Sequence, residues 1–523
     1  MPTVEPPSGA RVPVQVSPGA GEPAPLRRRR GWTDTRVALL ACLCLAFGVY
    51  WINLDDYFLG DDFDLIGSFY GAPPRYFFEL LYNNESGSAW KNLGIDSAQG
   101  HGYLRPLKIW LLKADLTAWG ARPLGFHLTA TLLFGLLLFA TYRLIDLALP
   151  NRREFALLGA ALVGIHPAFA EIVPFLTARE ETLAALFVVA AVVALVSHRA
   201  RGSSPSWFTL FLALGLLSKE SAIVALPLAV GWDLVHGHLR LYRTRELRCA
   251  LRVYGPSVLL LVVYGALRRV AFGNLLGGEG PTAFLSARAW LWFHARLFSS
   301  LIEARTFAGW WIPNVGWLMA GLALLTTSIA LARTFRTGGW RALLFFGPVW
   351  YLGATSILHG TYFSHRHNAV VAVGAASFAA VVCSALAGAA GPGGRRLVAA
   401  AAFALGALAW LPPTLAMERR FDQASGVVSD VRRRIEAATA HLPEGSAVKI
   451  VGVPQQAVPP YYFGWGLVSS LKRPFTPSDV GNRLVLVNRR NLMMNGSPLS
   501  RPRVYALKLD FRSEEAKAAP PTW

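Results

Sequence analysis

Residues 27–54 read RRRRGWTDTRVALLACLCLAFGVYWINL, in which a cluster of arginines is followed by an apolar run from Val37 to Leu54. That run is close to the roughly 20 apolar residues that a membrane-spanning helix needs. A cleaved signal peptide is the alternative, but the charged region before the apolar run is unusually long for one. We therefore interpret the run as a signal anchor. Residues 1–35, rich in Pro, Gly and Ala, are then a disordered cytoplasmic leader.

The composition of the whole chain also points to the membrane. Hydrophobic residues make up 53% of its 523 residues and charged residues only 16%, against roughly 25% charged in a typical soluble domain. Such a chain cannot cover its apolar mass with polar surface, which excludes a soluble enzyme, a disordered protein and a coiled coil. The net charge of +20 would suggest nucleic acid in a soluble protein. In a membrane protein Lys and Arg collect in cytoplasmic loops, so we expect no nucleic-acid partner.

Ten further apolar runs follow the first, each bounded by charged or turn residues, and together they predict about eleven membrane spans. The ten runs lie at 124–147, 154–174, 182–197, 206–218, 221–235, 254–271, 316–333, 340–358, 368–390 and 397–416. Arginines recur in every second connection, which is typical of cytoplasmic loops. This alternation places the leader in the cytoplasm and the loops 55–123 and 272–315 on the exported side.

The predicted fold class is an all-α polytopic membrane protein with a small exported C-terminal domain that is α/β or β-rich. The transmembrane domain covers residues 36–416, and the exported domain covers residues 417–523, where membrane hydropathy is lost. Within the exported domain, Ala447–Val453 and Leu484–Asn488 alternate or cluster residues that favour β-strands. A multi-pass protein of the bacterial inner membrane fits this organisation.

The first exported loop contains a dense group of acids. Residues 59–66 read LGDDFDLI, with three carboxylates in four residues, directly beyond the end of the first span. Such a group is costly at a membrane boundary unless its members are solvated, paired or used in chemistry. A solvated cap on the following helix is one interpretation, since Asp suits that position. A catalytic role is the other, and the residues alone leave both open.

Four further motifs follow in order along the chain. They are YLRPL at 103–107 with WGARPLGFHL at 119–128, HPAFAE at 166–171 with TAREETL at 177–183, LSKESA at 217–222, and YFSHRHN at 362–368. Together with the acidic loop, they resemble the GT-C glycosyltransferases, most closely the branch of protein O-mannosyltransferases and their relatives with tetratricopeptide tails. The resemblance covers roughly residues 36–370 and implies a GT-C-like fold. The tail departs from those relatives, because no tetratricopeptide array follows the spans.

The resemblance implies transfer of a sugar from a polyprenyl-phosphate donor to an acceptor on the non-cytoplasmic face. The acceptor is a protein, a lipid or a glycan, and membrane lipid surrounds the site. The displacement is inverting and either metal-independent or metal-assisted, so no cofactor is certain and a divalent cation stays open. An acceptor hydroxyl is a poor nucleophile and needs a base. Asp61 matches the first loop carboxylate of the family and is the predicted base, and Asp62 orients it, raises its pKa or binds a cation.

The donor phosphate should meet cationic side chains at the level of the lipid headgroups. Arg366, Arg105 and Lys219 lie near span ends on the predicted exported side and are the candidates. For Lys219 the alternative is an ion pair with the adjacent Glu220 or a snorkelling side chain, and for Arg366 it is an interfacial anchor.

Four residues are weaker candidates for binding the sugar or the acceptor: Glu171, Arg179, His127 and Glu220. Glu171 stands in an apolar run and needs a partner, and Arg179 beyond the next turn is the expected one. That pair would either fix the turn or bind sugar hydroxyls. A structural histidine is the alternative for His127. The spacing His365-x-His367 lacks a third ligand, so we predict no metal site at these two histidines.

Two other functions compete with sugar transfer. One is a transporter or flippase of a lipid-linked saccharide, and the other is a non-catalytic envelope assembly protein. A transporter should carry its charges near the middle of the bilayer. The densest carboxylate group of this chain lies instead in a loop at the membrane edge, which favours the enzyme.

Overall fold

The structure is a computed structural model, and the residues described are 32–75, 104–239, 244–272, 294, 313–335, 338–356, 365–454, 460–464, 466–487 and 505–512. The leader before residue 32 and most of the predicted loop 272–315 lie outside this set. So do residues 76–103, which belong to the first predicted exported loop.

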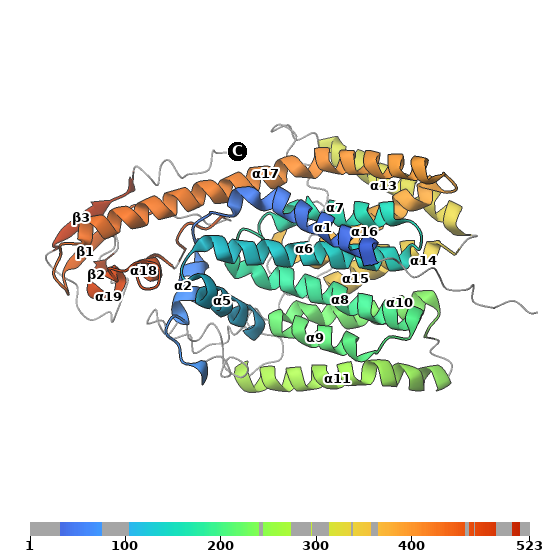
Figure 1. Ribbon diagram of the computed structural model, residues 1–523, viewed down its shortest axis with the longest axis horizontal. Coiled ribbons are helices and arrows are strands. Elements are labelled where there is room, and N and C mark those ends of the chain that lie inside the picture. The colour runs from blue at the N-terminus through green and yellow to red at the C-terminus, as the bar shows by residue number, and fades with distance from the viewer. Residues whose placement is uncertain are drawn as a thin grey trace, which may run out of the picture.

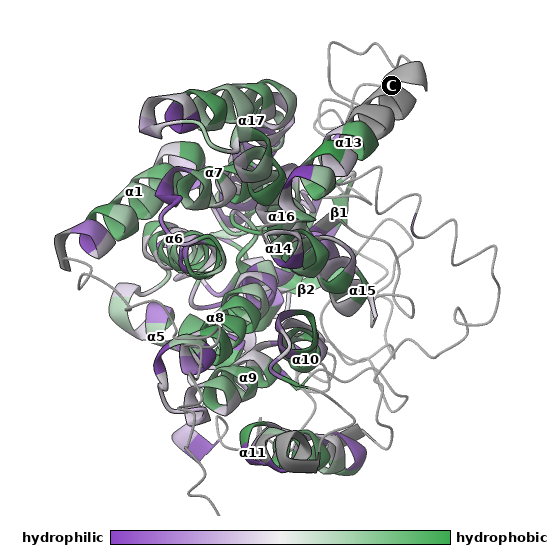
Figure 2. Ribbon diagram, turned by 90° about the vertical axis from the view of Figure 1, so that its right-hand side faces the viewer, coloured by the Kyte–Doolittle hydropathy of each residue, from purple (hydrophilic) through white to green (hydrophobic). Residues whose placement is uncertain are grey.

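A bundle of apolar helices makes up most of the molecule (Figures 1 and 2). Its helices are α1 (Trp32–Tyr50), α6 (Pro123–Ala148), α7 (Arg153–Gly164), α8 (Arg179–Arg201), α9 (Ser206–Ser218), α10 (Ala225–His236), α11 (Thr244–Phe272), α13 (Pro313–Thr334), α14 (Trp340–Leu344), α15 (Trp350–Thr355), α16 (Ala369–Ala387) and α17 (Pro392–Thr439). Helices α1, α6, α7, α8 and α16 pack against one another and hold much of the buried apolar core. Two further helices, α2 (Asp61–Ser68) and α5 (Pro106–Trp119), lie at one end of the bundle (Figure 1).

Six helical segments among the described residues are long and apolar enough to cross a membrane: 34–53, 123–148, 176–201, 250–270, 366–387 and 392–439. A mostly helical integral membrane protein is therefore confirmed. The other five predicted spans are not among these six segments and coincide with α7, α9, α10, α13 and the pair α14 and α15. Of these, α7, α9 and α10 have only 12, 13 and 12 residues. The count of about eleven spans stays a prediction.

Two interruptions position the candidate site. Helix α7 ends at Gly164, although the apolar run continues to residue 174, because the sequence His166-Pro167 cannot continue a helix. Helix α9 ends at Ser218, where Lys219 is extended with φ −163° and ψ 143°, and a short turn of 3-10 helix over Glu220–Val224 leads into α10. Both breaks expose backbone and polar side chains inside an apolar bundle, which is costly unless the groups are paired or used.

The C-terminal domain is built on a three-stranded parallel sheet of order β2-β1-β3. Its strands are β1 (Ala447–Val451), β2 (Val485–Val487) and β3 (Leu507–Asp510), and the short helices α18 (Leu467–Ser470) and α19 (Val480–Arg483) lie between β1 and β2 along the chain. Both predicted strand segments thus contain strands. Helix α17 leads from the bundle to this domain and continues as one helix past residue 416, where we expected the transmembrane domain to end (Figure 1).

Candidate active site

The three carboxylates of the acidic loop have different surroundings. Asp62 is only 2% exposed, and its two oxygens accept hydrogen bonds from the backbone N–H of Leu59 at 3.1 Å and of Thr177 at 2.8 Å. Asp64 accepts a hydrogen bond from the hydroxyl of Ser469 in the C-terminal domain. Asp61 is exposed. Asp62 and Asp64 therefore hold the loop in place, and Asp61 is the carboxylate that a substrate can reach.

The charges around Asp61 come from three separate parts of the chain. Protein atoms around the carboxyl group of Asp61 exclude part of its hydration although the residue is open to solvent on one side, and this desolvation raises its pKa above the usual range. The positive charges of Arg366 and Lys108 oppose that shift. The negative charge of Glu180 adds to it. Burial also raises the pKa of Asp62 to about 7, against the two hydrogen bonds from the backbone. Asp61 thus lies within electrostatic range of two cations and is a stronger base than an ordinary surface carboxylate.

A cluster of ion pairs lies beside Asp61. Arg105, the residue before α5, donates to Glu180 and to Glu220, each at 2.8 Å. Lys108, one turn further along α5, is 3.2 Å from the other carboxylate oxygen of Glu180. Glu180 and Glu220 belong to the start of α8 and to the break after α9, so α5 ties these two elements together.

The second half of the cluster is centred on Glu181. Its carboxylate accepts a hydrogen bond from Lys219 and lies 3.8 Å from Nε2 of His367. Arg268 of α11 lies 4.0 Å from the carboxylate of Glu220 and connects the cluster to that helix. The structure therefore brings together Arg105, Lys219 and Glu220, which the sequence analysis had singled out separately.

Arg366 lies in the turn His365–Asn368 directly before α16. Its charge acts on three carboxylates, those of Asp61, Glu171 and Glu180. These three belong to the acidic loop, to the segment after α7 and to the start of α8. Arg366 is thus placed where these segments meet, although Tyr362, Phe363 and Ser364 of its motif lie outside the described residues.

The expected pair of Glu171 with Arg179 is wrong. Arg179 is 1% exposed and donates at 2.6 Å to Asp115 of α5 and at 2.8 Å to the carbonyl oxygen of Phe126. Arg179 is the first residue of α8, and its side chain reaches α5 and α6 rather than the preceding loop. The carboxylate of Glu171 lies within electrostatic range of Arg366 instead.

The alternative of an ion pair between Lys219 and Glu220 is also wrong. Lys219 bonds to Glu181, and Glu220 bonds to Arg105. The cause is the extended backbone at residue 219, because successive side chains of an extended chain point to opposite sides. The two side chains therefore bond to different partners, although the charge of Lys219 still acts on Glu220.

His127 does not join the cluster. It is 3% exposed, and its Nε2 lies 3.0 Å from the carbonyl oxygen of Asp56, in the segment that leads from α1 to α2. This contact ties α6 to that segment and is what a structural histidine provides. Among the described residues, no three His, Cys, Asp or Glu side chains gather as metal ligands.

The sequence analysis missed Lys108, Glu180, Glu181 and Arg268 as site residues. A signal existed for three of them. Glu180 and Glu181 are adjacent acids at the start of a long apolar run, where charges need partners. Lys108 follows Arg105 by three residues, the spacing that puts two side chains on one face of a helix.

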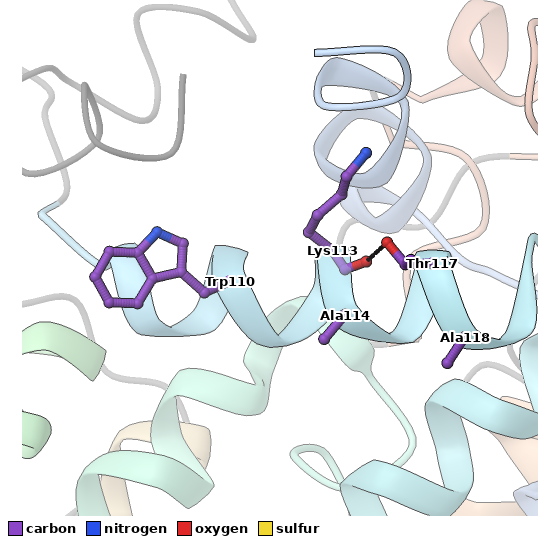
Figure 3. Close-up of a pocket in the computed structure, with 5 residues that line it drawn as sticks. All are labelled: Trp110, Lys113, Ala114, Thr117 and Ala118. Carbon is purple, nitrogen blue, oxygen red and sulfur yellow. Dashed lines mark hydrogen bonds between the residues drawn. The ribbon is translucent and has the colours of Figure 1, made fainter. Parts of the chain in front are cut away.

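A surface pocket of about 470 Å³ lies along α5 but does not include the charged cluster (Figure 3). Its lining residues are Trp110, Lys113, Ala114, Thr117 and Ala118. Lys113 donates at 3.4 Å to the carbonyl oxygen of Phe69, and Thr117 donates at 2.8 Å to the carbonyl oxygen of Lys113. The two cations of the charged cluster, Arg105 and Lys108, precede the lining residues of this pocket along the chain.

Comparison with curated proteins finds similarity to animal O-mannosyltransferases. The chain is 33% identical over 198 residues to protein O-mannosyl-transferase Tmtc1 of Drosophila melanogaster and 29% identical over 278 residues to Tmtc2 of the same species. It is 27% identical over 202 residues to protein O-mannosyl-transferase F38B6.6 of Caenorhabditis elegans. These matches cover 36%, 50% and 37% of this chain and 22%, 28% and 27% of the relatives. The chain therefore spans about a quarter of the length of the curated relatives it matches.

Two solved structures match most of the chain at low similarity. One is ArnT from Cupriavidus metallidurans bound to undecaprenyl phosphate, with a TM-score of 0.47, 15% identity and coverage of 88% of this chain and 87% of that one. The other is the Archaeoglobus fulgidus oligosaccharyltransferase in complex with Zn and sulfate, with a TM-score of 0.42, 13% identity and coverage of 87% and 67%. No protein-family model matches the chain. The resemblance to the protein O-mannosyltransferases predicted from the motifs is confirmed by the sequence matches.

Proposed function

We propose that this membrane protein transfers a sugar from a polyprenyl-phosphate donor to an acceptor hydroxyl on the non-cytoplasmic face. The observation that carries the proposal is an exposed carboxylate, Asp61, within electrostatic range of Arg366 and Lys108 and beside a buried cluster of ion pairs. The similarity to relatives named as O-mannosyltransferases supports mannose as the sugar. The leader and the Arg-rich loops lie in the cytoplasm in this proposal, and the acidic loop and the C-terminal domain are exported.

The reaction is a single displacement. The acceptor oxygen attacks the anomeric carbon, its proton passes to the carboxylate of Asp61, and the bond from that carbon to the phosphate oxygen breaks. The lipid phosphate leaves with the bonding electrons, and the sugar is inverted. General-base assistance of this kind contributes typically 10²–10⁴-fold to a rate. Asp62 holds Asp61 in position from within the loop.

Arg366 is the main contact for the donor phosphate in this proposal. Its planar guanidinium group can donate hydrogen bonds to two phosphate oxygens at once. Its charge also acts on Asp61, the proposed base. Arg105 and Lys219 are already bonded to Glu180, Glu220 and Glu181. We therefore assign them to the walls of the donor site, where their charge favours the phosphate.

The function is tested with the purified protein in nanodiscs and a radiolabelled polyprenyl-phosphate mannose. A threonine-containing peptide and fractions of a cell-envelope extract serve as acceptors, and the release of polyprenyl phosphate and the labelled product are measured. We expect transfer to a hydroxyl group. Movement of the donor between the leaflets of a liposome, without transfer to any acceptor, would show a flippase and contradict the proposal.

The first prediction concerns pH. Asp61 acts as a base only when it is ionised, and its pKa is raised, so the rate should fall as pH is lowered through a value above the ordinary carboxyl range near 3.9. The measurement is kcat/KM for transfer between about pH 4 and pH 8, an interval that covers the pKa values of carboxyl groups raised above their usual range. Burial raises the pKa of Asp64 to about 6, so Asp64→Asn is the control. If the fall in rate at low pH disappears in Asp64→Asn, the titrating group is Asp64 and the prediction for Asp61 is wrong.

The second prediction concerns the donor phosphate. Arg366→Ala should weaken donor binding roughly 10–100-fold, since a hydrogen bond to a charged group contributes about 1.5–3 kcal/mol. Arg366→Lys should restore only part of this, because a point charge lacks the planar fork. Donor affinity is measured by binding of labelled lipid to the protein in detergent. Arg122→Ala, at an exposed arginine before α6, is the control. Wild-type affinity in Arg366→Ala would remove this residue from the site.

A further inference from the structure

A group of buried polar side chains lies between the end of α1 and α17. Three of them are spaced by three residues, which puts side chains on one side of a helical turn. The turn Trp51–Asn53 that follows α1 packs against α17, and Figure 1 shows the two helices together there. All four side chains belong to residues that are at most 3% exposed. We call this group the oxygen cluster, and its members are Tyr50, Asn53, Asp56 and Glu418.

The amide of Asn53 joins the members of the cluster. Its nitrogen donates to Oδ2 of Asp56 at 2.5 Å and to the backbone carbonyl oxygen of Glu418 at 3.0 Å. An amide nitrogen has two hydrogens, so these bonds use both of them. Among the described residues, no group bonds to Oδ1 of Asn53, to either carboxylate oxygen of Glu418 or to the hydroxyl of Tyr50. The cluster therefore contains buried oxygen atoms whose bonding capacity is unused.

The charge of the cluster is also unbalanced. The negative charge of Asp56 acts on Glu418, and those of Asp55 and Asp422 act on Asp56. Within the described part of the chain, no Lys, Arg or His forms an ion pair with Asp56 or Glu418. Buried carboxylates in proteins are normally paired or coordinate a metal. The cluster thus lacks both a positive charge and partners for its oxygen atoms.

A proton and a cation differ in how far they would complete this cluster. A proton on one carboxyl group removes one charge and supplies one hydrogen bond, which leaves the other oxygen atoms without partners. A hard cation supplies charge and binds several oxygen atoms at once. Ca²⁺ takes carboxylate and amide carbonyl oxygens in a flexible geometry, and two carboxylates balance its charge. The cluster offers oxygen atoms alone, whereas zinc and copper sites use nitrogen or sulfur.

We propose that the oxygen cluster binds Ca²⁺ through the carboxylates of Asp56 and Glu418 and the side-chain carbonyl oxygen of Asn53. Asp55 and Asp422 are exposed, and their charges attract the ion toward the buried members. Only two members are acids. The site therefore differs from a group of three His, Cys, Asp or Glu ligands, which the described residues do not contain.

The location of the site gives the ion a structural role. The backbone N–H of Tyr57 donates at 2.6 Å to the hydroxyl of Ser425 in α17, so the segment after α1 is already attached to that helix. The ion adds a second attachment directly before this one. It holds the segment that leads into the acidic loop and takes no part in the reaction proposed for Asp61. The inference is therefore independent of the proposed function.

The first measurement is the binding of radioactive Ca²⁺ by equilibrium dialysis, with the full chain in detergent after treatment with a chelator. We expect saturable binding of a single ion, with Mg²⁺ as a weaker competitor because Mg²⁺ demands a stricter octahedral geometry. Glu418→Gln should weaken binding more than about 100-fold, since even the outer partners of metal ligands typically contribute 10–100-fold. Asp430→Asn removes a carboxylate from the exposed face of the same helix and should bind as wild type.

Thermal unfolding shows whether Glu418→Gln has folded. In chelator, this variant should be at least as stable as wild type, because it lacks an uncompensated buried charge. Ca²⁺ should raise the unfolding temperature of wild type and of Asp430→Asn but not that of Glu418→Gln, since an ion that binds only the folded state stabilises it.

Three results would overturn the inference. One is the absence of Ca²⁺ binding by wild type, and another is equal binding by wild type and Glu418→Gln. The third is a wild type that is stabilised by lowering the pH and not by Ca²⁺, because protons would then complete the cluster. Asp61→Asn should keep the whole Ca²⁺ response. Loss of the response in Asp61→Asn but not in Glu418→Gln would place the ion at the acidic loop instead.

Discussion

Replacing Asp61 by asparagine is expected to lower the rate of sugar transfer by roughly 10²–10⁴-fold, because the variant keeps the shape of the side chain and loses the proton acceptor. Donor binding should survive, since the proposed phosphate contacts come from Arg366 and the neighbouring cations. The alternative is that Asp61 only stabilises the first turn of α2, whose N-cap residue is Gly60. A residue with that role would lose about 0.3–1 kcal/mol of interaction with the helix dipole and would keep the transfer activity.

The matched comparison is Asp62→Asn. Both oxygens of Asp62 accept backbone hydrogen bonds, and an asparagine amide can accept at only one of its two ends. This variant should loosen the loop and lower thermal stability, with a smaller and indirect effect on transfer. Both variants are assayed for donor binding, sugar transfer and thermal unfolding in detergent. Near wild-type transfer by both would show that the two acids only shape the loop and that the catalytic assignment is wrong.

The sequence was sufficient to find the charged motifs but not their partners. Arg105, Lys219 and Glu220 stand out because charges are rare in apolar surroundings. Which carboxylate each cation meets depends on how α5, α8 and the break after α9 pack. Arg179 illustrates this, because its partner is not the nearby Glu171 but Asp115, 64 residues away. Sequence spacing governs pairs within one helix and says little about pairs between helices.

The fold could be predicted to a similar extent. Apolar runs locate helices well, and the alternation in Ala447–Val453 indicated a strand where β1 lies. The break before His166-Pro167 had a local cause, so it could have been placed more closely than residue 174. The contact of residues 461–470 with the acidic loop has no periodic signal. It depends on Gly466, where a Cβ atom would lie 2.3 Å from the carbonyl oxygen of Gly60, and this need for glycine appears only when the other backbone lies against it.

The buried pair of Arg179 with Asp115 offers the largest expected effect on stability. Arg179→Ala should lower the free energy of unfolding by about 3–5 kcal/mol, because it leaves a buried carboxylate with no cation. The side chains of the pair are 1% and 7% exposed, and of the hydrogen bonds to Asp115 within the described part of the chain the one from Thr129 would remain. The carbonyl oxygen of Phe126 would also lose a donor. Thermal unfolding in detergent is the measurement.

A second Arg–Asp pair of nearly the same length provides the control. Arg153 lies 2.7 Å from Asp34, against 2.6 Å in the buried pair, but its side chain and that of Asp34 are 42% and 49% exposed. Arg153→Ala should therefore cost less than about 1 kcal/mol. The double variant Arg179→Met with Asp115→Leu should recover much of the stability, since apolar residues of similar volume can replace a buried ion pair. If Arg179→Ala is no less stable than Arg153→Ala, the pair contributes nothing to holding α5 and α6 against α8.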